Sequence, residues 1–193
     1  MKPPVAPSAA AKPWKLEQAA QVVRSGGVIA YPTEAVFGLG CDPENEQAVR
    51  RILDLKQRPV EKGVILIAAD QRQLAPYLLP IRKEHQQQLD EYWPGPVTCV
   101  LPASDRAPKW ITGGRPSIAV RVTAHPVVSA LCQRAGMPLV STSANKAGRE
   151  PLRDAASVRK SLGHALDHIV NAPVGDLAEP TRIIDLASGK TLR

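Results

Sequence analysis

Short apolar runs and helix-length amphipathic segments are interleaved along this chain, which limits the folds it can adopt. The clearest run is GVILIAA (residues 63–69), continuous as in a strand covered on both faces. Similar runs predict strands at 28–31, 97–101, 117–122, 139–142, 169–170 and 183–186. Helices are expected at 16–25, from 42 to the break before Pro59, at 70–92 with a break near Pro80, at 125–135 and at 153–162. The pattern predicts an α/β (α+β) domain built on one mixed sheet.

A length of 193 residues suits one domain with short tails. Residues 1–13 are rich in Pro and Ala and lack the apolar core of a signal peptide, so we expect a disordered tail followed by the domain at 14–193. No apolar run approaches transmembrane length, which indicates no membrane partner.

Charge and cysteine content indicate the kind of partner and compartment. The net charge of +7 favours anionic partners such as nucleotide phosphates or RNA. Cys41, Cys99 and Cys132 are odd in number and have no C-x-x-C spacing, so neither a disulfide framework nor a zinc cluster is indicated. Free thiols in apolar runs fit the cytoplasm.

The segment Lys56-Gln57-Arg58-Pro59 follows a predicted helix. Pro59 favours an extended conformation at Arg58, and residues two apart in an extended chain share a face. Lys56 and Arg58 are therefore candidates to bind one polyphosphate, one as a point charge and one as a fork. A solvated basic helix end is an equally good interpretation of the pattern alone.

Two polar segments follow predicted strands. In YPTEAVFGLG (31–40), a proline turn exposes the Thr33 hydroxyl and a carboxylate; in STSAN (141–145), three hydroxyls and an amide come together. Open α/β sheets bind ligands at strand ends, which makes both segments candidate sites. An ordinary turn and a loop that satisfies its own backbone are the alternatives.

Two further features bear on ligand binding. Arg121 lies inside the run 117–122, where its charge meets either solvent or an anionic ligand such as a carboxylate. The string SGKT (188–191) resembles the end of a P-loop, but Ile184 occupies the position of the required glycine. Residues 188–191 are therefore interpreted as a tail.

The strings YPTEAVFGLGCDP, LKQRPVEKGVILIAA, WPGPVTCVLPA, IAVRVTAHP and PLVSTSAN occur in this order and resemble the YrdC-like family, in its short bacterial TsaC-type form. The resemblance covers nearly all of residues 14–193. It implies a twisted mixed sheet with a concave basic cleft. It also implies synthesis of threonylcarbamoyl-AMP and pyrophosphate from L-threonine, bicarbonate and ATP, for the modification of adenosine 37 in tRNA.

The resemblance also implies roles for particular residues. Lys56 and Arg58 match the family's K-x-R pair, expected to hold ATP phosphates and to be catalytic, and Ser143 and Asn145 match its S-x-N pair at the nucleotide. The remaining implied contacts are Arg149 with ATP, and Thr33, Arg121, Ser141 and Thr181 with threonine. Many relatives carry histidine where this chain has Ile67.

No permanent metal site is expected, and Mg²⁺ is expected to arrive with the ATP phosphates. The threonine carbamate is the nucleophile in the implied reaction, so the protein has to position reactants and neutralise charge. The expected partners are these substrates, together with tRNA or the proteins that transfer the threonylcarbamoyl group.

Three alternatives remain open from the sequence. A non-catalytic module that binds double-stranded RNA or tRNA fits the charge, although 4% aromatics disfavours a single-strand stacking platform. The second alternative is a carbamoyl-transfer accessory domain, similar to one in hydrogenase maturation proteins, which are much longer chains. A relative acting on another amino acid is the third alternative.

Overall fold

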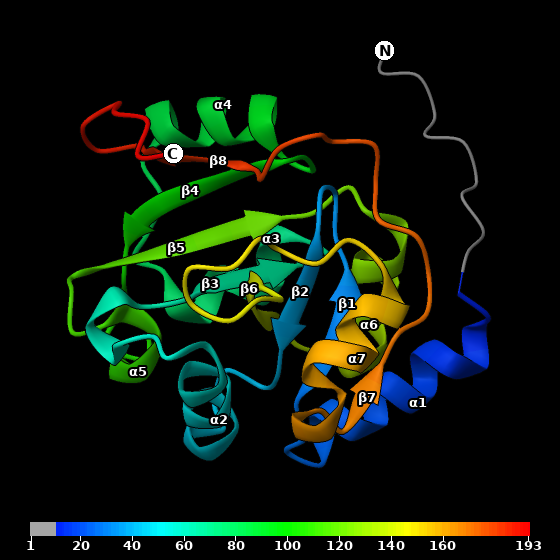
Figure 1. The fold of residues 1–193 in the computed structure, drawn as a ribbon. Coiled ribbons are helices and arrows are strands. Elements are labelled where there is room, and N and C mark those ends of the chain that lie inside the picture. Colours follow the sequence, from blue (N-terminus) through cyan, green and yellow to red (C-terminus); the bar gives the residue numbers. More distant parts are fainter. Residues whose placement is uncertain (1–10) are drawn as a thin grey trace.

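The computed structural model describes residues 11–193 (Figure 1). Eight strands form one sheet in the order β7-β1-β2-β6-β3-β5-β4-β8. Three pairs are parallel (β1–β7, β3–β5 and β4–β8) and the others antiparallel, so the predicted mixed sheet is confirmed. The strands are β1 Ile29–Pro32, β2 Phe37–Gly40, β3 Ile65–Ala68, β4 Val97–Pro102, β5 Ser117–Val122, β6 Leu139–Ser143, β7 His168–Ile169 and β8 Arg182–Asp185.

Seven α-helices are present in the described part of the chain: α1 Pro13–Arg24, α2 Glu46–Lys56, α3 Gln71–Leu74, α4 Lys83–Tyr92, α5 Lys109–Thr112, α6 Pro126–Ala135 and α7 Ala155–Leu162. No helix between residues 11 and 193 has the length and apolar character needed to cross a bilayer. Residues 1–10 of the expected disordered tail (1–13) lie outside the described residues. Helix α1 begins at Pro13, the last residue assigned to that tail.

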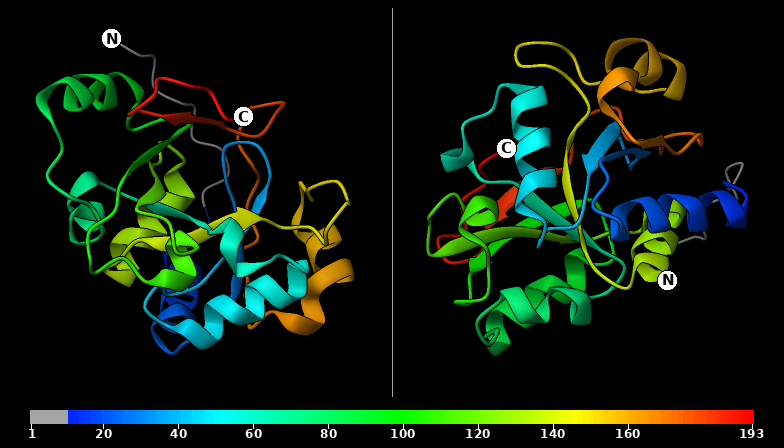
Figure 2. Two further views of the ribbon diagram at one scale, coloured as in Figure 1. Left: turned by 90° about the vertical axis from the view of Figure 1, so that its left-hand side faces the viewer. Right: turned by 90° about the horizontal axis from the view of Figure 1, so that it is seen from below.

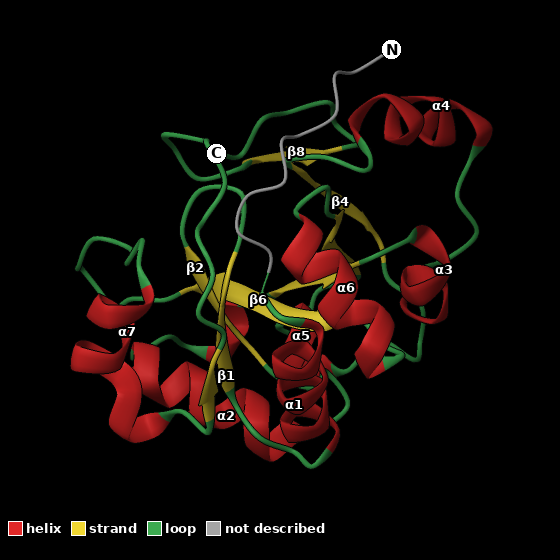
Figure 3. Ribbon diagram, turned by 90° about the vertical axis from the view of Figure 1, so that its right-hand side faces the viewer, coloured by secondary structure: helices red, strands yellow, loops and turns green. Residues whose placement is uncertain are grey.

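Helices cover both faces of the sheet (Figure 3). Neighbouring residues of a strand point to opposite faces, and Leu66 and Ile67 of β3 belong to two different apolar clusters. The cluster around Ile67 contains α1 and α6, which pack against each other, whereas the cluster around Leu66 includes Ile52 of α2 and Val158 of α7. Ile67 is fully buried and is therefore a core position.

Strand β2 was not predicted, and its glycines are the reason. Glycine weakens a strand, so FGLG gives no strand signal. A Cβ on Gly40 would lie 2.5 Å from the Val140 carbonyl oxygen and 2.6 Å from the Tyr31 ring. The Tyr31 hydroxyl donates to that same carbonyl at 3.0 Å. The tyrosine therefore crosses over Gly40, and the close approach requires glycine.

The predicted helix start at residues 42–44 is wrong by a few residues. Asn45 caps α2 by accepting from the Ala48 amide at 3.0 Å. The Asp42 carboxylate instead accepts from the Glu44 amide, which makes a turn before the helix. Residues 70–92 are also less helical than predicted, because α3 is followed by the 3-10 turn Ala75–Tyr77 and by non-helical residues up to Arg82.

After β7, a crossover segment (residues 171–181) runs over the molecule to β8 (Figure 1). Its Gly175 and Leu177 amides donate to the Thr33 and Glu34 carbonyls, so it lies on the turn between β1 and β2. After β8 the chain turns back, and Thr191 bridges to Ile184. The SGKT string is thus the turn of a hairpin and has no P-loop structure.

Candidate functional site

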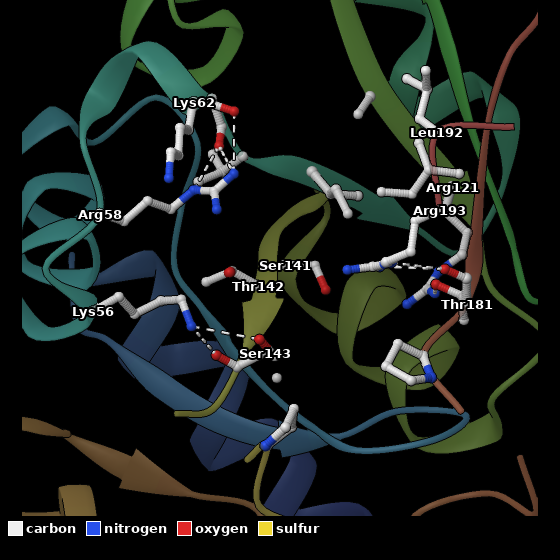
Figure 4. Close-up of a pocket in the computed structure, with 18 of the residues that line it drawn as sticks. Lys56, Arg58, Lys62, Arg121, Ser141, Thr142, Ser143, Thr181, Leu192 and Arg193 are labelled. Carbon is white, nitrogen blue, oxygen red and sulfur yellow. Dashed lines mark hydrogen bonds between the residues drawn. The ribbon is translucent and has the colours of Figure 1, made fainter. Parts of the chain in front are cut away.

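A cavity of about 660 Å³ opens beside the C-terminal end of β6 (Figure 4). It is lined by the β1–β2 turn, the end of α2 with the following loop, β5, β6 and residues 180–193. Figure 2 (right) shows α2 standing beside the segment that follows β6. Segments from both halves of the sequence therefore build the walls.

The cavity lining is strongly basic. Six of its side chains are cationic and one, Asp185, is acidic; the cations are Lys56, Arg58, Lys62, Arg115, Arg121 and Arg193. Lys56, Arg58 and Lys62 lie at one end, and Arg121 and Arg193 lie at the other with Thr181 (Figure 4). A concentrated positive charge in a concave site attracts anions, so the cavity suits a polyphosphate together with a carboxylate.

Lys56, the last residue of α2, is almost completely buried. Its ammonium group donates to the Ser143 carbonyl, to the Asn145 carbonyl at 3.1 Å and to Asn145 Oδ1 at 2.9 Å. Lys56 thus organises the segment that follows β6. Burial, and to a smaller degree the neighbouring Arg58 charge, lowers the pKa of Lys56 to about 8.

Arg58 lies beside Lys56 at the same end of the cavity (Figure 4). Its guanidinium donates to the Gly63 carbonyl at 2.9 and 3.1 Å and to the Lys62 carbonyl at 3.1 Å. Burial and the Arg115 charge lower its pKa. The extended conformation predicted between the two cations is not the observed arrangement, because Gln57 adopts a left-handed conformation with φ of 50°. Both side chains nevertheless line the cavity.

Ser143 and Asn145 form the wall next to Lys56. The Ser143 hydroxyl donates to Asn145 Oδ1 at 2.6 Å, and Asn145 Nδ2 donates to the Arg149 carbonyl at 2.7 Å. The loop therefore satisfies part of its own hydrogen bonding. The Arg149 side chain is exposed and is not part of the cavity lining, so only its backbone contributes to the loop.

The four residues predicted to contact threonine, Thr33, Arg121, Ser141 and Thr181, all line the cavity, and Arg121 and Thr181 lie at the end away from Lys56 (Figure 4). Arg121 is only 4% exposed, which excludes a solvent-facing charge on β5. Its Nη1 donates to the Thr181 hydroxyl at 2.6 Å. The structure therefore joins residues from the β1–β2 turn, β5, β6 and the end of the crossover segment.

Sequence reasoning did not single out Lys62, Arg115 or Arg193, which also line the cavity. The Arg193 guanidinium donates to the Thr181 carbonyl at 3.2 and 3.3 Å, and burial and the Arg121 charge lower its pKa. Arg193 reaches the site only because the chain folds back after β8. No local sequence signal predicts that contact.

A comparison with family models matches residues 21–193 to the Sua5/YciO/YrdC model, which carries the description "Telomere recombination". The chain belongs to this family. The threonylcarbamoyl-AMP synthase of Halorhodospira halophila is 54% identical over 94% of this chain and 95% of its own length. The threonylcarbamoyl-AMP synthase of Coxiella burnetii is 47% identical over 92% of this chain and 96% of its own length.

Solved structures of the Sua5/YciO/YrdC family agree with the fold. The structure of P. abyssi Sua5 complexed with L-threonine has a TM-score of 0.86 and 34% identity over 91% of this chain. This chain spans about half of that protein, 52% of its length. E. coli YciO has a TM-score of 0.81 and 30% identity, and the match covers 91% of this chain and 85% of that one. A full-length HypF structure, at 16% identity and a TM-score of 0.78, shows the shared fold alone.

This member of the family has no metal-binding cluster of three or more His, Cys, Asp or Glu side chains among residues 11–193. Among the described residues, Asp185 is the one carboxylate of the cavity lining, and it accepts from the Ser188 hydroxyl at 2.8 Å. Such a site fits Mg²⁺ carried by phosphate oxygens and water, because Mg²⁺ commonly keeps its waters and binds through few carboxylates.

Proposed function

We propose that this chain is a threonylcarbamoyl-AMP synthase, which converts L-threonine, bicarbonate and ATP to threonylcarbamoyl-AMP and pyrophosphate for the modification of adenosine 37 in tRNA. The observation that carries the proposal is one cavity with two chemically different ends. Lys56, Arg58 and Lys62 supply positive charge at one end, and the other end combines the Arg121 and Arg193 guanidinium groups with the Thr181 hydroxyl. The high identity to synthases of this name supports the same assignment.

The site suits a reaction in which the substrate supplies the nucleophile. A threonine carbamate attacks the α-phosphate through one carbamate oxygen, and pyrophosphate leaves with the bond electrons. The chain then has to hold the two reactants in line and neutralise the phosphate charge. Mg²⁺ bound to the ATP phosphates would share in that neutralisation.

The roles of individual residues are part of this proposal. Lys56 fixes the wall formed by Ser143 and Asn145 against the nucleotide, and Arg58 holds ATP phosphates with Lys62 beside it. Arg121 binds the threonine carboxylate, with Thr33, Ser141 and Thr181 as hydroxyl partners of the same substrate. Arg149 stays a predicted ATP contact that would require its exposed side chain to turn toward the cavity.

Purified protein incubated with ATP, Mg²⁺, bicarbonate and individual amino acids tests the function. We expect pyrophosphate release that depends on threonine, with a product of threonylcarbamoyl-AMP mass. Release with a different amino acid would retain the chemistry and change the substrate. A folded protein that releases no pyrophosphate with any amino acid would contradict the proposal.

The proposal favours catalysis over the RNA-binding alternative because six basic side chains converge inside one cavity. Transfer of the product to tRNA, by partner proteins, and a location in the cytoplasm remain predictions. The three buried free cysteines are consistent with a reducing compartment.

A further inference from the structure

Arg121 contacts a buried acidic residue, Glu34, that is not part of the cavity lining. Glu34 is 8% exposed and follows Thr33 in the turn between β1 and β2. Its Oε2 lies 3.3 Å from Arg121 Nη2. A buried guanidinium without an anion is strongly unfavourable, so Glu34 makes Arg121 tolerable inside the fold.

Glu34 is itself held by a second buried residue. The Thr123 hydroxyl donates to Glu34 Oε1 at 2.6 Å and accepts from the His125 amide at 3.0 Å. Thr123 is 2% exposed and, like Glu34, does not line the cavity. The order of contacts is therefore Thr123 to Glu34 to Arg121, with only the last residue reaching the cavity.

The contact between Glu34 and Arg121 is an ion pair by distance, but Glu34 Oε2 makes no hydrogen bond within the described residues. Arg121 Nε is also buried with no hydrogen-bond partner there. The guanidinium is thus held by the Thr181 hydroxyl and by attraction to Glu34, and some of its N–H groups donate no hydrogen bond within the described residues. A carboxylate ligand is the chemical group that would accept from them.

The crossover segment fixes the backbone of the same turn. The Leu177 amide donates to the Glu34 carbonyl at 3.1 Å, and the Gly175 amide donates to the Thr33 carbonyl at 2.9 Å. Thr181 at the end of this segment is the hydrogen-bond partner of Arg121. Glu34 and Thr181, the two residues that contact Arg121, are therefore linked by backbone hydrogen bonds between the turn and the crossover segment.

We propose that Glu34, anchored by Thr123, is a positioning residue that orients Arg121 to receive the carboxylate of the amino-acid substrate. This rests on the proposed function for the identity of that substrate. Glu34 would also repel a carboxylate, but Arg193 places a second positive charge near Arg121. Two guanidinium groups and one carboxylate leave the charge around Arg121 positive, so a carboxylate is still attracted and the orientation of Arg121 decides binding.

Three substitutions test the proposal through the KM values for threonine and ATP. Glu34→Gln removes the charge at almost unchanged size and should raise the threonine KM about tenfold or more, because small misplacements of a binding group are costly. Thr123→Val removes the hydroxyl that donates to Glu34 and accepts from the His125 amide, and it should raise the threonine KM about fivefold, whereas Thr123→Ser should restore it. The ATP KM should stay within about twofold in each case.

Thr98→Val is the matched control. Thr98 is buried on β4, the strand next to Arg121's own strand, and its hydroxyl has no partner in the described part of the chain. The same Thr-to-Val change there should leave the threonine KM unaltered. Thermal unfolding of every variant, followed by circular dichroism, confirms that the compared proteins are folded.

A second measurement does not depend on turnover. Nitrogen NMR of the Arg121 side chain reports rotation of the guanidinium, which should be slow in the wild type and in Thr123→Ser and faster in Glu34→Gln and Thr123→Val.

Combining Glu34→Gln with Arg121→Lys should add little to the threonine KM of Arg121→Lys alone, because Glu34 acts through Arg121.

The outcomes separate the two proposals. A wild type without threonine-dependent turnover overturns the proposed function, while the NMR comparison still decides whether Glu34 orients Arg121. A threonine KM that is unchanged or lower in Glu34→Gln overturns the positioning role, as does equal guanidinium rotation in all variants. An equal rise of the threonine KM and the ATP KM in Glu34→Gln would indicate a purely structural role for Glu34 and would also overturn the positioning role.

Discussion

Lys56 shows how a single residue can serve both folding and ligand binding. A buried ammonium requires hydrogen-bond acceptors, and here they come from the backbone and side chain of the segment after β6. The same segment forms the wall of the cavity next to the cationic end. Loss of Lys56 therefore affects the shape of the wall as well as the charge of the site.

We predict that Lys56→Met lowers the free energy of unfolding by about 1–3 kcal/mol, because the Ser143 and Asn145 oxygens lose their donor. The ATP KM should rise in the same variant. Urea denaturation and steady-state kinetics measure the two effects. Lys160→Met, at an exposed position on α7, should change the free energy of unfolding by less than about 0.5 kcal/mol. Equal stability of both variants would contradict the structural role of Lys56.

The lowered pKa of Lys56 predicts opposite effects of pH on binding and on stability. Below about pH 8 the lysine is protonated both folded and unfolded. Above it the folded chain loses the proton first, so ATP binding should weaken as the cation disappears. The unfolded chain still binds that proton, so the contribution of Lys56 to folding stability should rise with pH from about 8 toward the ordinary lysine pKa.

Calorimetric titration with ATP and urea denaturation, both from pH 7 to 10, measure these two trends. Lys56→Met should show neither of the contributions. An ATP affinity that stays constant through pH 8 in the wild type, or falls equally in Lys56→Met, would show that the titrating group is a different one.

Among the elements, the crossover segment connects most directly to the proposed threonine end of the cavity. A Cβ on Gly175 would lie 2.7 Å from the Glu34 carbonyl oxygen and 3.0 Å from its Cα. Both are backbone atoms, which cannot turn aside as a flexible side chain can. Glycine therefore lets the segment lie close against the turn that carries Thr33 and Glu34.

We predict that Gly175→Ala pushes the segment off this turn and destabilises the fold by about 1–3 kcal/mol. The threonine KM should rise more than the ATP KM, because Thr181 shifts with the segment and Lys56 does not. Gly163→Ala is a matched control, since its Cβ would meet only the Arg159 side chain at 3.4 Å or more. A similar change in both KM values for Gly175→Ala would contradict this link.

The sequence predicted those elements whose apolar pattern is local and continuous. Strand β5 begins and ends where expected, and α1 and α6 agree within a few residues because glycines and prolines mark their ends. Strand β2 was missed since its glycines serve Tyr31, a contact across the hairpin. The start of α2 was misplaced because Asp42 and Asn45 are both good capping residues and only the fold selects between them.

Most of the candidate site could be predicted from motifs, whereas its internal contacts could not. Each residue assigned to threonine or phosphates lines the cavity, with the exception of Arg149. The bonds from Lys56 to the loop after β6 and from Thr181 to Arg121 join residues far apart in the chain. Such pairs depend on strand order, which local spacing does not contain.

On the scale of the whole molecule, the cavity has a local excess of positive charge. Among the described residues, six of the chain's 25 lysines and arginines line it, against one carboxylate. We predict that ATP affinity falls several-fold between low and high ionic strength, because salt screens these charges. Threonine, a zwitterion, should bind with little salt dependence. Calorimetric titrations with each ligand in increasing NaCl measure both affinities. Equal salt dependence of ATP and threonine binding would contradict an action of the cavity charge on the nucleotide.

The shared oxygens around Lys56 also limit how this site can be redesigned. Lys56 donates to the backbone carbonyls of residues 143 and 145 and to the Asn145 side chain, so positions 56 and 145 behave as one unit, and a library that randomises 145 while keeping the lysine would remove one of its acceptors in most variants. Lys62 and Arg115 line the same cavity without belonging to that unit. A search for altered nucleotide preference would therefore begin at these two positions, where sequence changes are independent of the loop.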